Sequence, residues 1–419
     1  MRPTNPSLLA LLAIALAVVG AGCSDSGTAD STLDAVTDTV AGIERWTWPE
    51  GGAAQLAWRL DTAAVIGGFD ASGEGFQFDQ VGTGGLVGDR DGNLYVLDGA
   101  GRRVLGYDAT GALIGVWGRE GNGPGEFANP GGLAVAPDGA LWVTDDGNRR
   151  VTLIPRQEGQ EPVSIPLTES AGAVSGDIAL ADDGLYGVLR TFRFSPGDDA
   201  GPPPLALVHM NLEGTYDDTL WTAERPPMDQ VEARMGNQMM MLLVQQAFAP
   251  GFYWAQFGDG TFALVEGPEY VIHLLDTDGD EVRTIRRDPP AREPTVEDIE
   301  GERERQRDRA PPSNMPGAEQ LMEKRLEALT FADRIPRVTG LAVDTQDRLW
   351  VGVSVDTPGE TERIDVYDRD GLLLGELPGR EGIPLAFYGS NLAAEITVDD
   401  LDVQQVVVYR VVESGAAAD

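Results

Sequence analysis

Two short loops hold charged and polar side chains in the same order, and they are the first candidates for a binding site. Residues 98–103 read Asp-Gly-Ala-Gly-Arg-Arg, and residues 145–150 read Asp-Asp-Gly-Asn-Arg-Arg. A carboxylate pairs strongly with a guanidinium, so Arg103 and Arg150 are each expected to bind the preceding aspartate. The first arginine of each of these Asp/Arg loops is left to meet an anionic ligand. The ligand-binding candidates are Asp98, Arg102, Asp145, Asn148 and Arg149.

The sequence offers little for metal catalysis. It contains two histidines, His209 and His273, each inside an apolar run, and a single cysteine. A zinc site needs three or four clustered ligands. Aspartate-rich turns at 89–92, 276–280 and 368–371 lack the glutamate of an EF-hand loop, and Asp-Gly is a preferred hairpin turn. We therefore expect no metal site, no cofactor and no identifiable catalytic residue.

Both Asp/Arg loops follow a pattern that recurs along the chain. The pattern starts at Gly85 as GLVGDRDGNLYVLD, at Gly132 as GLAVAPDGALWVTD and at Gly340 as GLAVDTQDRLWVGV, with weaker copies at Gly176 and Tyr253. Each copy has two short apolar runs separated by turn residues, which predicts two antiparallel strands. A repeat of roughly 40–50 residues with four short strands per unit is typical of β-propeller blades.

The Asp/Arg loops and the glycine-rich segments before them resemble the NHL repeat. In the second copy, residues 123–127 read Gly-Pro-Gly-Glu-Phe, residues 130–135 read Pro-Gly-Gly-Leu-Ala-Val, and residues 148–151 read Asn-Arg-Arg-Val. The resemblance covers residues 81–155 and 338–379. It implies an all-β fold, a six-bladed β-propeller.

The sixth blade requires strands from both ends of the chain. Residues 392–412 supply too few strands for a complete blade, and residues 58–66 can supply the missing one. Closure matters because an open sheet would leave an unpaired, aggregation-prone edge. The propeller is therefore expected over residues 56–414.

Two segments interrupt the repeat and are predicted to be helical insertions. Residues 226–250 contain helix formers and five methionines between prolines, which favours a helix with a soft apolar surface. Residues 292–336 begin with Thr295 and Asp298 in the form of a capping box. Both segments connect an outer strand to the next inner strand, so they are expected on the face that carries the Asp/Arg loops. The first helix either packs on the propeller or forms a mobile cap over the channel mouth.

Residues 1–22 are expected to be a signal peptide. Arg2 precedes an apolar run over residues 8–19, which is too short to span a membrane. Gly-Ala-Gly separates the run from Cys23, and small residues before a lone cysteine resemble a bacterial lipoprotein cleavage site. The resemblance implies a lipid on Cys23, and Ser24 after it resembles the outer-membrane class. An ordinary signal peptide with an incidental cysteine is the alternative.

Residues 23–55 are expected to be a flexible acidic tether, because residues 24–42 are mostly small, polar and acidic. The whole chain carries 31 basic and 68 acidic residues, a net charge of −37. Such a field repels nucleic acid and anionic lipid surfaces. We therefore expect no nucleic-acid partner, and membrane contact only through the N-terminal lipid.

The expected function is a binding or scaffold module for a peptide, carbohydrate or protein partner. The protein is expected to act as a monomer on the periplasmic or extracellular side of a bacterial cell envelope, anchored to the outer membrane. The alternative is a metal-dependent lyase or lactonase on the same propeller fold.

Overall fold

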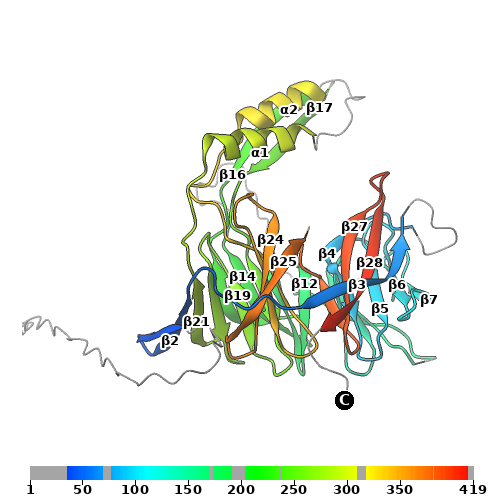
Figure 1. Ribbon diagram of the computed structural model, residues 1–419. Helices are drawn as coiled ribbons and strands as arrows, with labels where there is room; N and C mark the ends of the chain where they lie inside the picture. The colour runs from blue at the N-terminus through cyan, green and yellow to red at the C-terminus, as the bar shows by residue number, and fades with distance from the viewer. Residues whose placement is uncertain are drawn as a thin grey trace, which may run out of the picture. The chain divides into compact units, whose positions relative to one another are not determined.

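A computed structural model describes residues 35–68, 77–157, 159–168, 173–190, 203–235, 238–308, 318–380 and 382–413. Within these ranges the chain forms the predicted six-bladed β-propeller (Figure 1). No helix in them is long and apolar enough to cross a membrane. The predicted signal peptide and Cys23 lie outside the described residues.

The first three blades are antiparallel sheets whose strands follow one another in sequence, with the first strand innermost. Blade 1 contains β4 (Val81–Gly88), β5 (Leu94–Asp98), β6 (Arg103–Tyr107) and β7 (Leu113–Trp117). Blade 2 contains β8 (Pro130–Val135), β9 (Leu141–Asp145), β10 (Arg150–Ile154) and β11 (Val163–Pro166). Blade 3 contains β12 (Ala173–Ala181), β13 (Gly184–Arg190), β14 (Leu205–Asn211) and β15 (Tyr216–Ala223).

The remaining blades repeat this order, except that the last takes its outer strand from the N-terminal side of the chain. Blade 4 contains β18 (Tyr253–Gln256), β19 (Phe262–Val265), β20 (Val271–Leu275) and β21 (Glu281–Arg287). Blade 5 contains β22 (Val338–Val343), β23 (Leu349–Val353), β24 (Thr361–Tyr367) and β25 (Leu373–Arg380). Blade 6 contains β26 (Ala386–Tyr388), β27 (Leu392–Val398), β28 (Gln404–Glu413) and β3 (Trp58–Gly67).

The pairing of β3 with β28 closes the ring. The two strands are antiparallel, and their register runs from Trp58 opposite Glu413 to Gly67 opposite Gln405. The prediction that residues 58–66 complete the sixth blade is therefore confirmed. The outer strand of blade 6 thus comes from the start of the propeller sequence, and it ties the two ends of the domain together.

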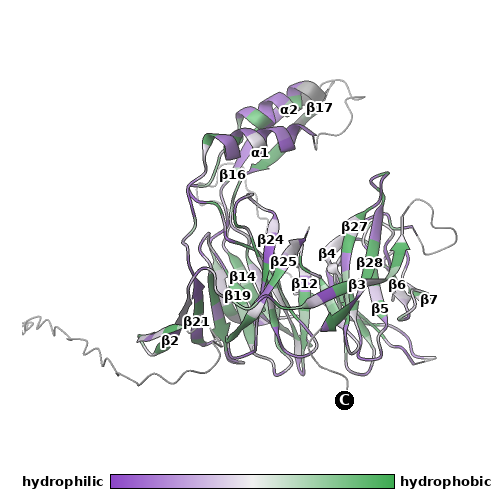
Figure 2. Cartoon of the chain, viewed as in Figure 1, coloured by the Kyte–Doolittle hydropathy of each residue, from purple (hydrophilic) through white to green (hydrophobic). Residues whose placement is uncertain are grey.

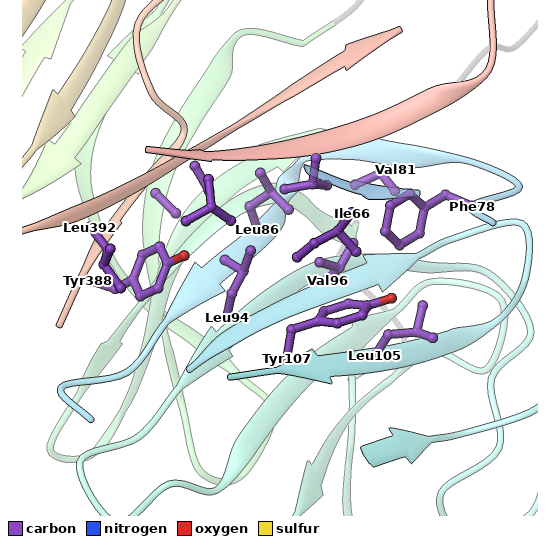
Figure 3. Packing of buried hydrophobic residues seen from close by; sticks show 14 residues of the cluster. Ile66, Phe78, Val81, Leu86, Leu94, Val96, Leu105, Tyr107, Tyr388 and Leu392 are labelled. Carbon is purple, nitrogen blue, oxygen red and sulfur yellow. The ribbon is translucent and has the colours of Figure 1, made fainter. Parts of the chain in front are cut away.

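Apolar side chains fill the interfaces between neighbouring blades. Figure 3 shows one interface, where Ile66 of β3 and Tyr388 of β26 pack near Leu94 and Val96 of β5. The strands of the blades carry most of the hydrophobic residues in Figure 2. Because each blade contacts two neighbours, its second strand is buried on both faces. This explains the continuous Leu-aromatic-Val run of the repeat, since a doubly buried strand reads as an uninterrupted apolar segment.

Part of the predicted tether is instead β-structure. β1 (Val36–Val40) pairs with β2 (Ile43–Trp48), and β2 pairs in parallel with β21, so the sheet of blade 4 has six strands. Trp48 is only 2% exposed and belongs to the apolar cluster between blades 4 and 5. The tether prediction over residues 23–55 is therefore wrong for residues 36–48. Its composition argument overlooked two tryptophans whose burial favours order.

The insertion at residues 226–250 is a β-hairpin, so the helix predicted there is wrong. β16 (Met228–Met235) pairs with β17 (Gln238–Gln245) in an unbroken antiparallel register. Along β17, Met241 is exposed, whereas Leu242 and Val244 face an apolar cluster. Such alternation has a period of two, which is that of a strand. The helix-forming residue types are a weak preference that tertiary packing overrides.

The insertion at residues 292–336 contains both helices of the described chain, α1 (Val296–Asp308) and α2 (Ala318–Glu327). The capping box before α1 is confirmed. The Asp298 amide donates to Thr295 Oγ1 at 3.2 Å, and the Thr295 amide donates to Asp298 Oδ2 at 2.7 Å. These bonds satisfy amides that the first helical turn leaves without intrahelical partners.

Candidate functional site

The two insertions form one unit, called here the insertion arm: β16, β17, α1, α2 and the connecting residues 246–252 and 328–336. Val231 and Val244 of the hairpin share an apolar cluster with Leu329, beyond the end of α2. Lys324 Nζ donates to the Glu232 carbonyl at 2.8 Å, and the Ala247 amide donates to the Thr330 carbonyl at 2.8 Å. The arm thus has its own small core, separate from those between the blades.

The insertion arm and the Asp/Arg loops leave the propeller at the same end. The hairpin follows β15 and precedes β18, while the helices follow β21 and precede β22. Each thus joins an outer strand to the next inner strand. The Asp/Arg loops join the second and third strands of blades 1 and 2. In antiparallel four-stranded blades these two kinds of connection share a face, so the predicted placement is confirmed.

A cavity of about 350 Å³ lies between the insertion arm and blades 4 and 5. Its aromatic walls are Phe248 in the arm and Tyr253 at the start of β18. Phe248 has a φ of 57°, a left-handed conformation that is strained for a bulky side chain. Backbone strain of this kind concentrates at ligand sites. The strained backbone of Phe248 therefore marks the cavity as a candidate binding site.

Charged and polar side chains also line this cavity. Arg305 Nε donates to Glu302 Oε2 at 2.9 Å, but Arg305 Nη2 is buried without a hydrogen-bond acceptor. Burial raises the pKa of Tyr253, with no hydrogen bond contributing to that shift, so its hydroxyl is neutral. Glu360 also lines the cavity and is exposed. The site therefore offers a cation, a phenol and a carboxylate around an aromatic wall.

A network of side-chain hydrogen bonds holds Arg305 in place. Gln306 Nε2 donates to Glu302 Oε1 at 2.7 Å, and Arg325 Nη2 of α2 donates to Gln306 Oε1 at 2.7 Å. Both Glu302 oxygens are therefore occupied within the arm. Because these hydrogen bonds link α1 to α2, they fix the face of α1 that borders the cavity.

The two aspartates of the Asp/Arg loops are fully buried. Asp98 accepts hydrogen bonds from the amides of Asp79 and Gln80, and it pairs with Arg103 at 3.0 Å. Asp145 accepts from the amides of Ala128 and Asn129 in the same way. The predicted bond from Arg150 to Asp145 is wrong, because the Arg150 guanidinium donates to backbone carbonyls of residues 122, 123 and 126. Each aspartate thus binds the segment that leads into the inner strand of its own blade. This arrangement braces the blades.

The other three candidates in the Asp/Arg loops make similar contacts. Asn148 Nδ2 donates to Asp145 Oδ2 at 2.7 Å, Arg102 Nε donates to the Ala128 carbonyl at 3.0 Å, and Arg149 Nη2 donates to the Thr168 carbonyl at 3.3 Å. Arg102 and Arg149 have φ values of 53° and 51°. The candidates lie on the insertion face, but none lines the cavity beside the arm. Their role in ligand binding stays a prediction.

The central channel is a second cavity, of about 300 Å³. The innermost strands line it with mostly small or apolar residues, and Asp177 is its one charged side chain among the described residues.

His209 and His273 each contact a carboxylate, Asp217 at 2.8 Å and Glu281 at 2.5 Å. No group of three or more His, Cys, Asp or Glu side chains within the described ranges is arranged to hold a metal ion.

The aspartate-rich turns have the geometry of ordinary hairpin turns. The side chain of Asp276 accepts from the amides of Asp278 and Asp280, and Asp368 accepts from the amides two and four residues later in the same way. Asp89 makes the equivalent bonds in blade 1. An aspartate that bonds its own backbone two residues on is a common turn former. The turn interpretation of these segments is confirmed.

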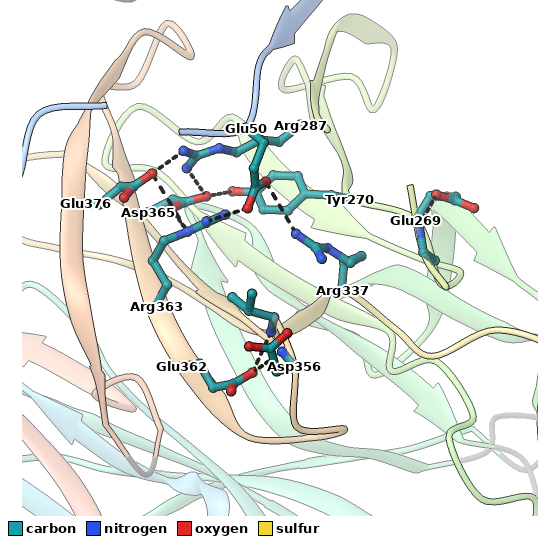
Figure 4. Close-up of polar contacts among 12 residues, drawn as sticks. Glu50, Glu269, Tyr270, Arg287, Arg337, Asp356, Glu362, Arg363, Asp365 and Glu376 are labelled. Carbon is teal, nitrogen blue, oxygen red and sulfur yellow. Dashed lines mark hydrogen bonds and ion pairs between the residues drawn. The ribbon is translucent and has the colours of Figure 1, made fainter. Parts of the chain in front are cut away.

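A buried group of charges joins blades 4 and 5, as Figure 4 shows. The Arg287 guanidinium is fully buried and pairs with Asp365 at 2.5 Å and with Glu376. The Tyr270 hydroxyl donates to Asp365 at 2.9 Å. Burial, together with the negative charge of Asp365, raises the pKa of Tyr270 well above its usual value. The hydroxyl therefore remains a donor, as a buried carboxylate requires.

The same group attaches the N-terminal segment to blade 5. Glu50, between β2 and β3, pairs with Arg363 at 3.1 Å and with Arg337 at 3.6 Å. Sequence reasoning missed this group because its members come from segments far apart in the chain. Arg305 and Tyr253 of the cavity were missed for another reason. The charged run around Arg305 has the pattern of a solvated helix, and Tyr253 that of an ordinary strand residue.

No protein-family model and no curated protein sequence matches the chain. Several solved structures are similar. A hypothetical exported protein of Bacteroides fragilis has 12% identity and a TM-score of 0.48, and the match covers 88% of this chain and 100% of that one. A DUF4221 member of Bacteroides vulgatus has 11% identity and a TM-score of 0.45, over 86% and 100%. The virginiamycin B lyase of Staphylococcus aureus has 11% identity and a TM-score of 0.40, over 84% and 99%.

Proposed function

We propose that this protein is an exported, lipid-anchored β-propeller that acts as a binding module, with a peptide, carbohydrate or protein as its partner. The observation that carries the proposal is the cavity between the insertion arm and blades 4 and 5. It combines an aromatic wall, a strained residue and the charged side chains of Glu302, Arg305 and Glu360. Concave sites with a few converging polar groups are where small ligands and peptide ends bind.

The alternative, a metal-dependent lyase or lactonase, has weaker support. The central channel in which such an enzyme would hold its metal offers Asp177 as its one charged group among the described residues. A catalytic zinc needs three protein ligands and an open position. Elemental analysis of the purified protein separates the two functions, because stoichiometric zinc or calcium would favour the enzyme.

The binding function can be tested by recovering partners from the native cell envelope. The mature protein is purified beside a variant in which residues 228–245 are replaced by a short Gly-Ser turn. The replacement is geometrically simple because the Gln246 amide donates to the Pro227 carbonyl at 3.2 Å. A molecule that co-purifies with the parent, and is lost or reduced with the variant, supports the proposal. Equal recovery with both would exclude the hairpin, β16 and β17, from binding.

A further inference from the structure

Asp177 lies in the central channel at a position where three other blades have glycine. Ile178 of β12 pairs with β13 at the same place where a leucine of blades 1, 2 and 5 pairs with the second strand. The residue before that leucine is a glycine in each case, namely Gly85, Gly132 and Gly340. Since three blades form without a side chain at this position, the propeller fold does not require the Asp177 carboxylate.

The neighbouring blades leave room for the backbone that carries this carboxylate. The pairing of β12 with β13 is irregular here, and residues 175–177 lie opposite a single residue of β13. A Cβ on Gly84 of β4 would lie 2.1 Å from the Gly176 carbonyl carbon, and a Cβ on Gly132 of β8 would lie 2.7 Å from the Gly176 oxygen. Side chains at these two positions in blades 1 and 2 would therefore displace the bulge. β-Bulges often aim a side chain at a functional site.

Solutes in the channel can reach Asp177. The residue is exposed and lines the channel cavity of about 300 Å³, in which it is the one charged side chain among the described residues. The described wall of the channel therefore carries a negative charge. The net charge of −37 adds to this field, which attracts cations and repels anions. The ligand expected here is a cation.

The rest of the channel wall favours an organic cation over a metal ion. Calcium takes roughly six to eight oxygen ligands, whereas Asp177 and Gln256 are the side chains with an oxygen atom among the described lining residues. Trp254 and Phe387 add aromatic surface, and the remaining lining residues are glycine or aliphatic. A volume of about 300 Å³ is at the small end of the range for small-molecule pockets. These features suit a small amine with an apolar body.

We propose that the central channel binds a small primary ammonium ion, with its charged head at Asp177 and its apolar body near Trp254 and Phe387. The carboxylate accepts hydrogen bonds from the ammonium, and charge-assisted bonds of this kind are stronger than neutral ones. The apolar body leaves water for the hydrophobic wall. This cavity shares no lining residue with the cavity beside the insertion arm. The inference therefore goes beyond the proposed function and stands independently of it.

The test uses three probes of one shape and calorimetric titration of the mature protein at neutral pH. Phenethylamine carries an ammonium, phenethyl alcohol is its neutral analogue, and hydrocinnamate places a carboxylate at the same end. Phenethylamine is expected to bind at least about tenfold more tightly than the alcohol, because a hydrogen bond to a charged group contributes more than a neutral one. Hydrocinnamate is expected not to bind. Binding of the alcohol or the anion as tightly as the amine would overturn the assignment of a cation.

A pair of matched variants locates the charged end of the ligand. Asp177→Asn is expected to weaken phenethylamine binding at least about tenfold. Asp182→Asn is the control, because Asp182 is exposed in the turn after β12 and does not line the cavity. It removes the same charge from the same blade and is expected to leave the affinity unchanged. Thermal unfolding checks that each variant folds. An unchanged affinity in folded Asp177→Asn, or an equal loss in Asp182→Asn, would refute the site.

Two further variants locate the apolar end and separate this site from the insertion arm. Leu385 lines the channel and is 36% exposed, so Leu385→Trp is expected to fill the cavity and abolish binding in a folded protein. Replacement of residues 228–245 by the Gly-Ser turn is expected to leave the affinity unchanged. Unchanged affinity in Leu385→Trp, or loss of binding in the hairpin replacement, would place the ligand outside the channel and overturn the inference. Recovery of an envelope partner tests the proposed function without these probes, so each proposal can fail while the other stands.

Discussion

At the scale of single residues, buried carboxylates hold the loops of the insertion face in place through hydrogen bonds. The carboxylate oxygens of Asp98 and Asp145 accept hydrogen bonds from backbone amides, and Asp145 also accepts one from a neighbouring side chain. The predicted pair of Arg103 with Asp98 is confirmed, but the equivalent pair in blade 2 is wrong, because Arg150 donates to backbone carbonyls instead. The contacts to preceding loops could not be predicted, since they depend on how each loop returns to its own blade.

Asp146, next to Asp145, makes stability depend on pH. Burial, and secondarily the charge of Asp145, raises the pKa of Asp146 to about 6 from 3.8. The folded state therefore holds this proton more tightly than the unfolded state. The stabilisation is complete below about pH 4 and is lost as pH rises through about 6. At pH 8 the folded protein must hold an unfavourable buried charge.

We therefore expect Asp146→Asn to stabilise the protein at pH 8 by about 1–2 kcal/mol, since two pKa units correspond to at most about 2.7 kcal/mol before solvent screening. The gain should vanish near pH 3.5. Chemical denaturation at both pH values measures it. Asp91→Asn, at an exposed turn position, is the control and should show no such pH-dependent gain. A gain that is equal at both pH values would contradict the explanation.

At the scale of elements, the insertion arm was placed correctly but half of its secondary structure was not predicted. The capping residues before α1 specify a helix start by themselves, so Thr295 and Asp298 sufficed. The Met-rich segment had no equivalent signal. Its strands are stabilised by packing of Val231 and Val244 on Leu329, near α2, a contact between segments that are 85 or more residues apart in the sequence. The intrinsic helix preference of a segment carries no information about such a distant packing partner.

Replacing residues 228–245 with a Gly-Ser turn should leave the propeller folded. Among the side chains of β16 and β17 that the structure describes, none belongs to the apolar clusters between blades. We expect a single cooperative transition within about 5 °C of the parent, because only a small satellite core is lost. Calorimetry measures the transition. Loss of cooperativity would show that the hairpin stabilises the blades as well.

At the scale of the whole molecule, closure and attachment depend on the N-terminal segment. The blade count and the closing strand were predictable because repeats fix the number of strands and expose the one that is missing. The route from β2 to β3 was not predictable. It depends on parallel pairing with β21 and on the Glu50 contacts, for which sequence spacing gives no rule.

Deleting residues 56–66 should destabilise the whole ring. The deletion removes the partner of β28 and the Ile66 side chain from the cluster between blades 6 and 1. We expect the melting temperature to fall by more than about 10 °C, at roughly 2–4 °C per kcal/mol, and aggregation to increase at the exposed edge. The hairpin replacement serves as the comparison, since it also removes strand residues. Equal melting temperatures for the two variants would show that closure contributes nothing.

Lipid attachment at Cys23 is tested on the protein in its native envelope. We expect mass spectrometry to find a mature N-terminus at Cys23 with an acyl modification, and the protein to fractionate with membranes. Cys23→Ser should release it to the soluble fraction. Membrane association that persists in this variant would contradict attachment through this residue alone.

The course of the N-terminal segment also determines where mechanical load enters the domain. From residue 36 the chain pairs within β1 and β2, lies beside β21, and is held by Glu44 at Arg283 and by Glu50 at Arg363 before it reaches β3. A pull on the N-terminal side must first separate β1 from β2 and then detach β2 from blade 4. The closing strand in blade 6 is loaded last. The ring can therefore stay closed while the segment ahead of it yields and refolds.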